Sequence, residues 1–193
     1  MPGSSWDDYD RSLVSAGGGV WPRTAKKIPL SPQVRERLGV TATELPPHEV
    51  VKALLTADVD LLWNGGIGTY VKASTEGHAD AADPANDAVR VEASDVRAAV
   101  IGEGGNLGLT QRARIEYALN GGRINADFID NATGVATSDR EVNLKVALDA
   151  AVAVGELPAA ERNTLLARVQ DEIGESVLAD AASQTLAISL AEV

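Results

Sequence analysis

Two glycine-rich stretches carry the residues whose types and spacing best suit cofactor chemistry. One is Asn64-Gly65-Gly66, the other is Gly102-Glu103-Gly104-Gly105-Asn106-Leu107-Gly108, and each follows a short apolar run. A turn of this kind between a strand and a helix is where a dinucleotide-binding fingerprint belongs, with Asp127 at about the spacing of a ribose-binding carboxylate. The strict G-x-G-x-x-G spacing fails, however. A tight turn that needs glycine at positive φ is the simpler explanation of the second stretch. An ordinary glycine loop explains the first stretch equally well.

A third candidate is the start of the helical pattern at Ser138. Ser138 and Glu141 have the spacing of a capping box, which predicts Ser138 as the N-cap of a helix. The free N–H groups and the positive dipole end of a helix suit a carboxylate ligand. The simpler alternative is that Ser138 only caps the helix and that Asn131 lies in a turn. The two roles are compatible if the serine hydroxyl turns toward a substrate.

Other kinds of chemistry find little support in the composition. The 193 residues include no cysteine, which excludes a thiol nucleophile, a disulfide framework and a Cys-ligated metal. His48 and His78 lack paired-ligand spacing, which argues against a metal site and a catalytic triad. The acidic residues between 76 and 87 are expected to form a solvated loop, and Tyr117 and Phe128 are expected to belong to the core.

The charge balance bears on partners and location. With 17 Lys and Arg against 28 Asp and Glu, the formal charge of −11 argues against binding nucleic acid or an anionic membrane through bulk charge. The first residues, Met1 to Asp10, are polar and acidic where a signal peptide needs a basic and then an apolar run. No apolar stretch approaches the ~20 residues of a membrane span. We therefore expect a cytoplasmic protein without a nucleic-acid or membrane partner.

Hydrophobic periodicity predicts the elements that position these candidates. The order strand, glycine turn, helix, strand is typical of a parallel α/β sheet. After Thr137 every signal is helical, and Gly174 weakens the last pattern enough to allow two helices there. The aromatic residues of the glycine- and proline-rich first 46 residues are expected to pack on something else. Helices are predicted over 32–38, 47–57 and 110–119, buried strands over 59–63 and 98–101, and a third strand over 123–125.

Four longer motifs stand out, and the first two are long and unusual. They are Ser5-Trp6-Asp7-Asp8-Tyr9-Asp10, Leu62-Trp63-Asn64-Gly65-Gly66-Ile67-Gly68-Thr69-Tyr70-Val71-Lys72-Ala73-Ser74, Glu103-Gly104-Gly105-Asn106-Leu107-Gly108 and Asp139-Arg140-Glu141-Val142-Asn143. With these motifs the sequence resembles the large NAD-dependent glutamate dehydrogenases of bacteria, from Ser4 to about Ala191. The resemblance implies oxidative deamination of L-glutamate to 2-oxoglutarate and ammonia, with NAD as hydride acceptor, in amino-acid catabolism.

The resemblance also implies roles for single residues. Glu103-Gly104-Gly105-Asn106, and Asn131 with Ser138, keep the order and spacing of smaller glutamate dehydrogenases. Asn131 and Ser138 would bind glutamate or 2-oxoglutarate. No catalytic residue and no metal ligand is expected here, because the lysine that promotes the reaction in this family lies upstream of anything resembling Ser4. The cofactor-binding residues would be Asn64, Gly65, Gly66, Gly104, Gly105 and Asn106.

The expected organisation follows from the same resemblance. We expect an α/β fold with a partial Rossmann-like parallel sheet followed by an all-helical C-terminal segment. Residues 1–136 would be the C-terminal part of a Rossmann-like nucleotide-binding domain with an extended N-terminal arm, and residues 137–193 the helical segment. Such a piece of the enzyme would be inactive alone and would belong to a homo-oligomer at full length. The alternative is a non-catalytic nucleotide-binding or interaction module derived from that enzyme.

Overall fold

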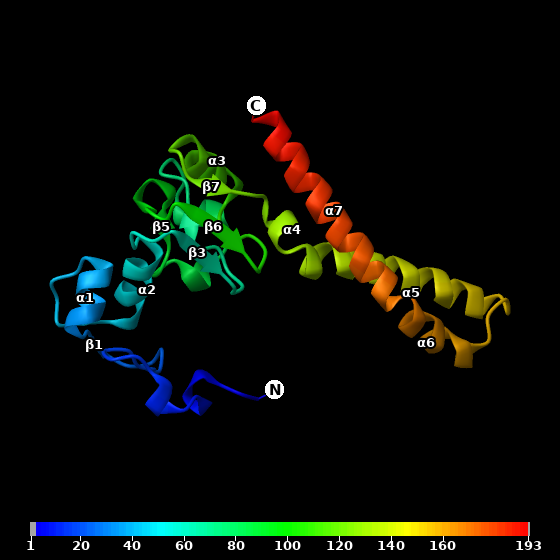
Figure 1. Cartoon of the computed structure of the whole chain (residues 1–193), viewed down its shortest axis with the longest axis horizontal. Helices are drawn as coiled ribbons and strands as arrows, with labels where there is room; N and C mark the ends of the chain where they lie inside the picture. The colour runs from blue at the N-terminus through cyan, green and yellow to red at the C-terminus, as the bar shows by residue number, and fades with distance from the viewer. Residues whose placement is uncertain (1–2, 193) are drawn as a thin grey trace. The chain divides into compact units, whose positions relative to one another are not determined.

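The computed structural model describes residues 3–192, so Met1, Pro2 and Val193, the outermost residues of the two predicted domains, lie outside the described part. The described residues form two compact units, and Figure 1 labels their longer helices and several of their strands. Unit 1 holds residues 3–62, 68–101 and 109–124, and unit 2 holds residues 63–67, 102–108 and 125–192. The predicted domain division between residues 136 and 137 stays a prediction.

The N-terminal part of unit 1 consists of short elements. The helix predicted over 32–38 is confirmed, and the Ser31 Oγ caps it by accepting a hydrogen bond from the Val34 N–H at 3.2 Å. Gly39 ends this helix at a φ of 68°, a left-handed conformation that glycine adopts without steric cost. Two 3-10 turns and an antiparallel strand pair surround the helix. The elements are η1 (Trp6–Asp8), η2 (Arg11–Leu13), β1 (Ile28–Pro29), α1 (Pro32–Leu38) and β2 (Glu44–Leu45).

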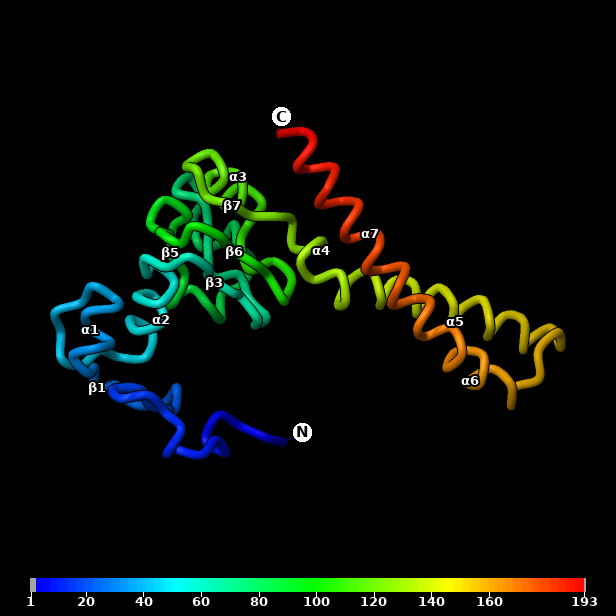
Figure 2. Tube along the Cα trace, in the orientation of Figure 1, coloured from blue at the N-terminus to red at the C-terminus, as the bar shows by residue number. Residues whose placement is uncertain are grey.

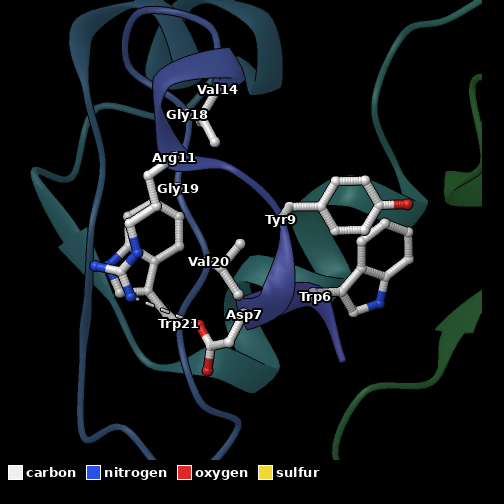
Figure 3. A pocket seen from close by; sticks show the side chains of 9 residues that line it. All are labelled: Trp6, Asp7, Tyr9, Arg11, Val14, Gly18, Gly19, Val20 and Trp21. Carbon is white, nitrogen blue, oxygen red and sulfur yellow. Dashed lines mark ion pairs between the residues drawn. The ribbon is translucent and has the colours of Figure 1, made fainter. Parts of the chain in front are cut away.

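The aromatic residues of this arm surround a small pocket (Figure 3). The rings of Trp6 and Tyr9 stack with their centroids 5.4 Å apart, and both side chains are exposed. Asp7 pairs with Arg11 at 3.8 Å, and Trp21 lines the same pocket of about 300 Å³. The packing of these aromatic side chains onto another element stays a prediction.

The main sheet of the molecule is parallel, as the strand and helix order predicts. Its strand order is β3-β6-β7, and in β6 Ile101 lies opposite Ile124 of β7. β3 runs in the same direction, because the Ala99 N–H donates to the Val59 carbonyl and the Gly104 N–H donates to the Asn64 carbonyl, both at 2.9 Å. The elements are β3 (Leu61–Asn64), β6 (Val100–Glu103), α3 (Gln111–Leu119) and β7 (Arg123–Ile124).

The prediction of a buried strand over 59–63 is wrong in burial and shifted in position. Leu61 and Trp63 of β3 are exposed, whereas Leu62 and Asn64 are half-buried. Successive residues of a strand point to opposite faces, so this alternation shows that only one face of β3 is partly covered.

The core of unit 1 lies where helix α3 meets two pairs of parallel strands. The Thr110 Oγ1 caps α3 by accepting from the Ala113 N–H at 3.1 Å, as predicted. Buried apolar side chains of the core include Val71, Val91, Ile101, Leu109 and Tyr117. The remaining elements of this unit are α2 (Pro47–Leu55), β4 (Val71–Lys72), the 3-10 turns η3 (His78–Ala81) and η4 (Pro84–Asn86), β5 (Val91–Glu92) and η5 (Ala93–Asp95).

Tyr117 confirms its predicted place in the core, and its hydroxyl donates to the Ala98 carbonyl at 2.6 Å. We expect Tyr117→Phe to lower the free energy of unfolding by about 1 kcal/mol, because the buried carbonyl loses this hydrogen bond. Urea unfolding of the chain at neutral pH measures the difference. Tyr9→Phe is the matched control, because Tyr9 is exposed, and it should leave the unfolding curve unchanged.

Burial also raises the pKa of the Tyr117 phenol above its ordinary value of 10.0. A raised pKa in the folded state means that the phenol supports folding fully below its unfolded pKa. That support is lost as the pH rises through the folded pKa. Tyr117→Phe should therefore remove part of the stability loss at strongly alkaline pH. An equally steep alkaline loss in both proteins would contradict this.

Unit 2 continues as helices after β7, and Figure 2 traces their path from α5 through α6 into α7. Ion pairs join Arg140 of α5 to Asp180 of α7, and Arg162 of α6 to Asp149 of α5. The last helical pattern is two helices, but the break falls at Val169 and Gly174 lies inside the second. The elements are α4 (Asp127–Asp130), the π-helical segment η6 (Thr133–Thr137), α5 (Ser138–Ala153), α6 (Ala159–Arg168) and α7 (Gln170–Ala191).

Phe128 corrects a second burial prediction, because its side chain is 52% exposed. It lies in the four-residue helix α4, in which Ile129 is the buried residue. Neighbouring residues on a helix point about 100° apart, so the residue beside a buried one faces elsewhere. Across residues 3–192, no helix has the length and apolar character that crossing a membrane requires.

Candidate functional site

The predicted cofactor residues gather where β3 and β6 end. The two strands are neighbours and parallel, so their carboxyl ends lie at the same edge of the sheet, where ligands of open α/β sheets bind. The Gly104 N–H donates to the Asn64 carbonyl at 2.9 Å and joins the two loops directly. All six residues, Asn64, Gly65, Gly66, Gly104, Gly105 and Asn106, belong to unit 2.

Close contact between the two loops explains their glycines better than positive φ does. Gly104, Gly105 and Gly108 are not among the glycines with positive φ. A Cβ on Gly105 would lie 2.5 Å from the Gly66 carbonyl oxygen, and one on Gly108 would lie 1.8 Å from the Asn64 Nδ2. The prediction that these turns need glycine for a left-handed backbone is therefore wrong for this stretch.

The left-handed residue of the turn is instead Leu107, with a φ of 57° and a largely exposed side chain. A bulky residue in this conformation costs about 1–3 kcal/mol and persists only where its surroundings hold it. Asp127 supplies part of that hold, because its Oδ2 accepts from the Leu107 N–H at 2.8 Å and its Oδ1 accepts from the Phe128 N–H at 2.9 Å. Asp127 thus positions the turn.

Two further carboxylates, to which the sequence analysis assigned no role, hold the same turn by accepting hydrogen bonds from its main chain. Glu103 is fully buried, and its Oε1 accepts from the Gly108 N–H at 2.9 Å. The Glu103 N–H donates to the Asp130 Oδ2 at 3.1 Å, and the Asp130 Oδ1 accepts from the Asn125 Nδ2 at 3.0 Å. The sequence carries a signal for Glu103, because it ends an apolar strand run, and a carboxylate buried there needs hydrogen-bond donors.

The two asparagines that the resemblance selects are brought together. The Asn131 Nδ2 donates to the Asn106 Oδ1 at 2.8 Å, although the residues lie 25 positions apart. Within residues 3–192, the Asn106 Nδ2 and the Asn131 Oδ1 make no other hydrogen bond. The pair therefore presents the Asn106 NH2 group as a donor and the Asn131 carbonyl oxygen as an acceptor, and it leaves a second N–H on the Asn131 Nδ2. A primary carboxamide, which carries both groups, is the complementary ligand.

Ser138 is not the N-cap residue that the sequence predicted. It has helical φ and ψ angles of −61° and −42°, and its N–H donates to the Val135 carbonyl. The π-helical segment η6 runs directly into α5, so Ser138 lies inside a continuous helical backbone and does not cap a helix end. The capping-box prediction is wrong, and with it the argument from free N–H groups. Only the exposed hydroxyl of Ser138 is left to contact a ligand.

The acidic stretch 76–87 of unit 1 is accessible to solvent, as predicted, because none of its residues is buried, and part of it is ordered around the buried side chain of Arg90. The Arg90 side chain is fully buried, pairs with the Asp87 carboxylate and lies 3.0 Å from the His78 Nδ1. Its Nε donates to the Thr69 carbonyl at 2.8 Å, and the Thr69 N–H donates to the Asp83 Oδ2 at 2.8 Å. Among residues 3–192, no group of three His, Asp or Glu side chains is arranged to hold a metal ion.

The sequence is similar to known proteins over nearly its whole length. The sequence matches the family described as bacterial NAD-glutamate dehydrogenase, catalytic domain, over residues 1–191. It is 53% identical over 192 residues to the NAD-specific glutamate dehydrogenase of Pseudomonas aeruginosa and 52% identical over 192 residues to that of Halomonas elongata, both covering 100% of this chain. It is 55% identical over 186 residues, 93% of this chain, to that of Mycobacterium tuberculosis.

The share of the relatives is small. The chain spans 12% of the length of each of these three proteins. The family match covers almost every residue of this chain, and the sequence identities to the three relatives exceed one half. Both findings assign this sequence to a family even though it is short. The chain belongs to the bacterial NAD-glutamate dehydrogenase family and matches within the catalytic domain of that family.

Proposed function

We propose that this chain forms part of the cofactor and substrate site of an NAD-dependent glutamate dehydrogenase. The reaction converts L-glutamate, NAD⁺ and water into 2-oxoglutarate, ammonium, NADH and a proton. The observation that carries the proposal is the Asn106–Asn131 pair at the carboxyl ends of β3 and β6, in a chain of this family. We also propose that the sheet is the C-terminal part of a Rossmann-like domain, which its parallel strands and its glycine turn before α3 support.

The residues present fit the nicotinamide end of NAD. A nicotinamide carries a primary carboxamide, and the Asn106 Nδ2 and Asn131 Oδ1 offer the donor and acceptor that such a group needs. When bound, NAD supplies the hydride acceptor, and the protein supplies orientation. The hydrogen bond from the Gly104 N–H to the Asn64 carbonyl holds the two loops together and so helps to position Asn106, two residues after Gly104.

Glutamate would be contacted by the second N–H of the Asn131 Nδ2, whose first N–H bonds Asn106, and by the hydroxyl of Ser138. Asn131 belongs to the turn that leads from α4 into η6, and Ser138 follows at the start of α5, so both lie in one helical stretch of unit 2. The helical N–H of Ser138 is already bonded, which leaves its hydroxyl as the contact. This role is weaker than a helix-capping anion site, and we expect Ser138→Ala to raise the KM for glutamate only about threefold.

The contacts of Lys72 and Lys145 support the expectation that no catalytic group lies here. Lys72 is buried and its Nζ bonds the Glu92 Oε1 at 2.8 Å. Lys145 pairs with Glu141 on the surface of α5. A lysine that promotes attack at the amino-bearing carbon needs a free amine next to the substrate. We therefore expect the isolated chain to form no NADH from glutamate.

A hybrid enzyme tests the proposal. The 192 aligned residues of this chain replace the matching segment of the Pseudomonas aeruginosa relative, which is 53% identical there. We expect the purified hybrid to reduce NAD⁺ with glutamate, followed by NADH absorbance, and the isolated chain to show no turnover. A folded hybrid without glutamate-dependent NADH formation would overturn the proposal. NADH binding by the isolated chain without turnover in the hybrid would favour a non-catalytic nucleotide-binding module instead.

A further inference from the structure

The indole of Trp63 is the largest of the apolar side chains that are exposed at this site, where Ile67 and Leu107 are exposed as well. Trp63 precedes Asn64 at the end of β3, and its side chain is 59% exposed. In β3 it shares its exposed face with Leu61, whereas Leu62 and Asn64 point to the opposite, half-buried face. Residues 3–192 contain no hydrogen-bond partner for the indole N–H.

The position of this ring is fixed by the backbone beneath it. A Cβ on Gly104 would lie 2.9 Å from the Trp63 Cζ2 and 3.3 Å from its Nε1. A Cβ on Gly65 would lie 3.3 Å from the same Nε1. The ring therefore lies against the two glycine-rich loops, and the missing side chain of Gly104 is what leaves room for it. Gly104 does not have a positive φ, and this contact with the indole explains why glycine is needed at that position.

We propose that Trp63 is a stacking platform for a planar heteroaromatic ring of the dinucleotide. This inference rests on the proposed function and adds a residue to it. An aromatic ring held at the carboxyl ends of parallel strands lies where the ligands of such sheets bind. It stands next to Asn64, and the neighbouring turn leads through Gly105 to Asn106, whose amide suits the carboxamide of the same cofactor. Stacking on an aromatic face accepts both nicotinamide and adenine, because both rings are planar and electron-poor or polarizable.

The test uses the hybrid enzyme and separates binding from turnover. We expect Trp63→Ala to raise the KM for NAD about tenfold with kcat changed less than about threefold, because only stacking is lost. Trp63→Phe retains a planar ring and should restore the KM to within about threefold of the unsubstituted hybrid. Gly104→Ala places a methyl group against the indole and displaces it, so this variant should raise the KM for NAD as Trp63→Ala does. Trp6→Ala is the matched control, because Trp6 is exposed but belongs to unit 1, and its KM should not change.

Inhibition by parts of the cofactor identifies the stacked ring. If the ring is adenine, Trp63→Ala weakens inhibition by ADP-ribose and leaves inhibition by nicotinamide mononucleotide unchanged. If the ring is nicotinamide, the pattern is reversed. An unchanged KM for NAD, or a lowered Tm and kcat with no change in KM, would overturn the inference, because it would show the indole covered by protein. Inactivity of the unsubstituted hybrid would instead defeat the proposed function, and this inference with it.

Discussion

Gly105→Ala is expected to lower kcat/KM for NAD in the hybrid enzyme about a hundredfold. The new methyl carbon would lie 2.5 Å from the Gly66 carbonyl oxygen, which is a main-chain atom, and the methyl carbon is itself attached directly to the main chain. No side chain can rotate to relieve it, so the loops that follow β3 and β6 must move apart. A displacement of about 1 Å at a reacting site costs about a hundredfold in rate. Overpacking should also lower the free energy of unfolding by about 1–3 kcal/mol. Steady-state NADH absorbance and urea unfolding measure the two effects.

Gly174→Ala is the control for this substitution. Gly174 lies inside α7, and a Cβ there meets no atom within 4 Å. Alanine in a helix interior is more stable than glycine by about 0.5–1 kcal/mol. We expect unchanged kinetics and a small gain in stability from Gly174→Ala. Unchanged kinetics from Gly105→Ala would refute the close contact of the two loops.

Arg90→Met is expected to destabilise the isolated chain by about 3–5 kcal/mol, because removing one partner of a buried ionic network leaves the others unpaired. The fully buried guanidinium bonds the carboxylate of Asp87 and the carbonyl of Thr69. Since domains are stable by only about 5–15 kcal/mol, this loss is close to unfolding. Urea unfolding measures it. Arg97→Met is the control, because the exposed Arg97 makes its bond to the Thr56 carbonyl at the surface, and it should cost less than about 1 kcal/mol.

The same network makes acid stability depend on Asp83. The hydrogen bond from the Thr69 N–H, then that from Asn86, and then the charge of Arg90 lower the pKa of Asp83 below its ordinary value of 3.8. A lowered pKa in the folded state gives stability that is present above the unfolded pKa and is lost as the pH falls through the folded pKa. Asp83→Asn should therefore flatten the loss of stability below about pH 4. An unaltered acid limb would contradict the role of these contacts.

Local signals in the sequence were sufficient for most elements. The caps at Ser31 and Thr110, and the order of strand, glycine turn, helix and strand, depend on neighbours within a few residues, and the structure confirms them. Helix and strand ends moved by one or two residues, because hydrogen bonding decides them and periodicity does not. The exposed faces of β3 and the exposure of Phe128 depend on what lies across the sheet or helix, which a single run of residues does not contain.

The site itself was only partly within reach of the sequence. Spacing placed Gly104, Gly105 and Asn106 in one turn, but their contacts with Gly66 and Asn64 are made by residues about 40 positions earlier. The family resemblance selected Asn106 and Asn131 as site residues, but neither the resemblance nor a local pattern predicted the hydrogen bond between them. Ser138 misled because a capping box and a helix interior share the same residue types, and the π-helical segment before α5 carries no distinct signal.

A double-mutant cycle on Asn106 and Asn131 in the hybrid enzyme tests the central claim most directly. We expect Asn106→Ala and Asn131→Ala each to lower kcat/KM for NAD about tenfold, because each removes one of the two contacts to the carboxamide. The kcat/KM of the double variant should be little lower than that of the more impaired single variant, because the two amides also hydrogen-bond each other. Asn163→Ala, on the exposed surface of α6, should change nothing. Wild-type kcat/KM in both single variants, or losses that simply add, would contradict a shared amide site.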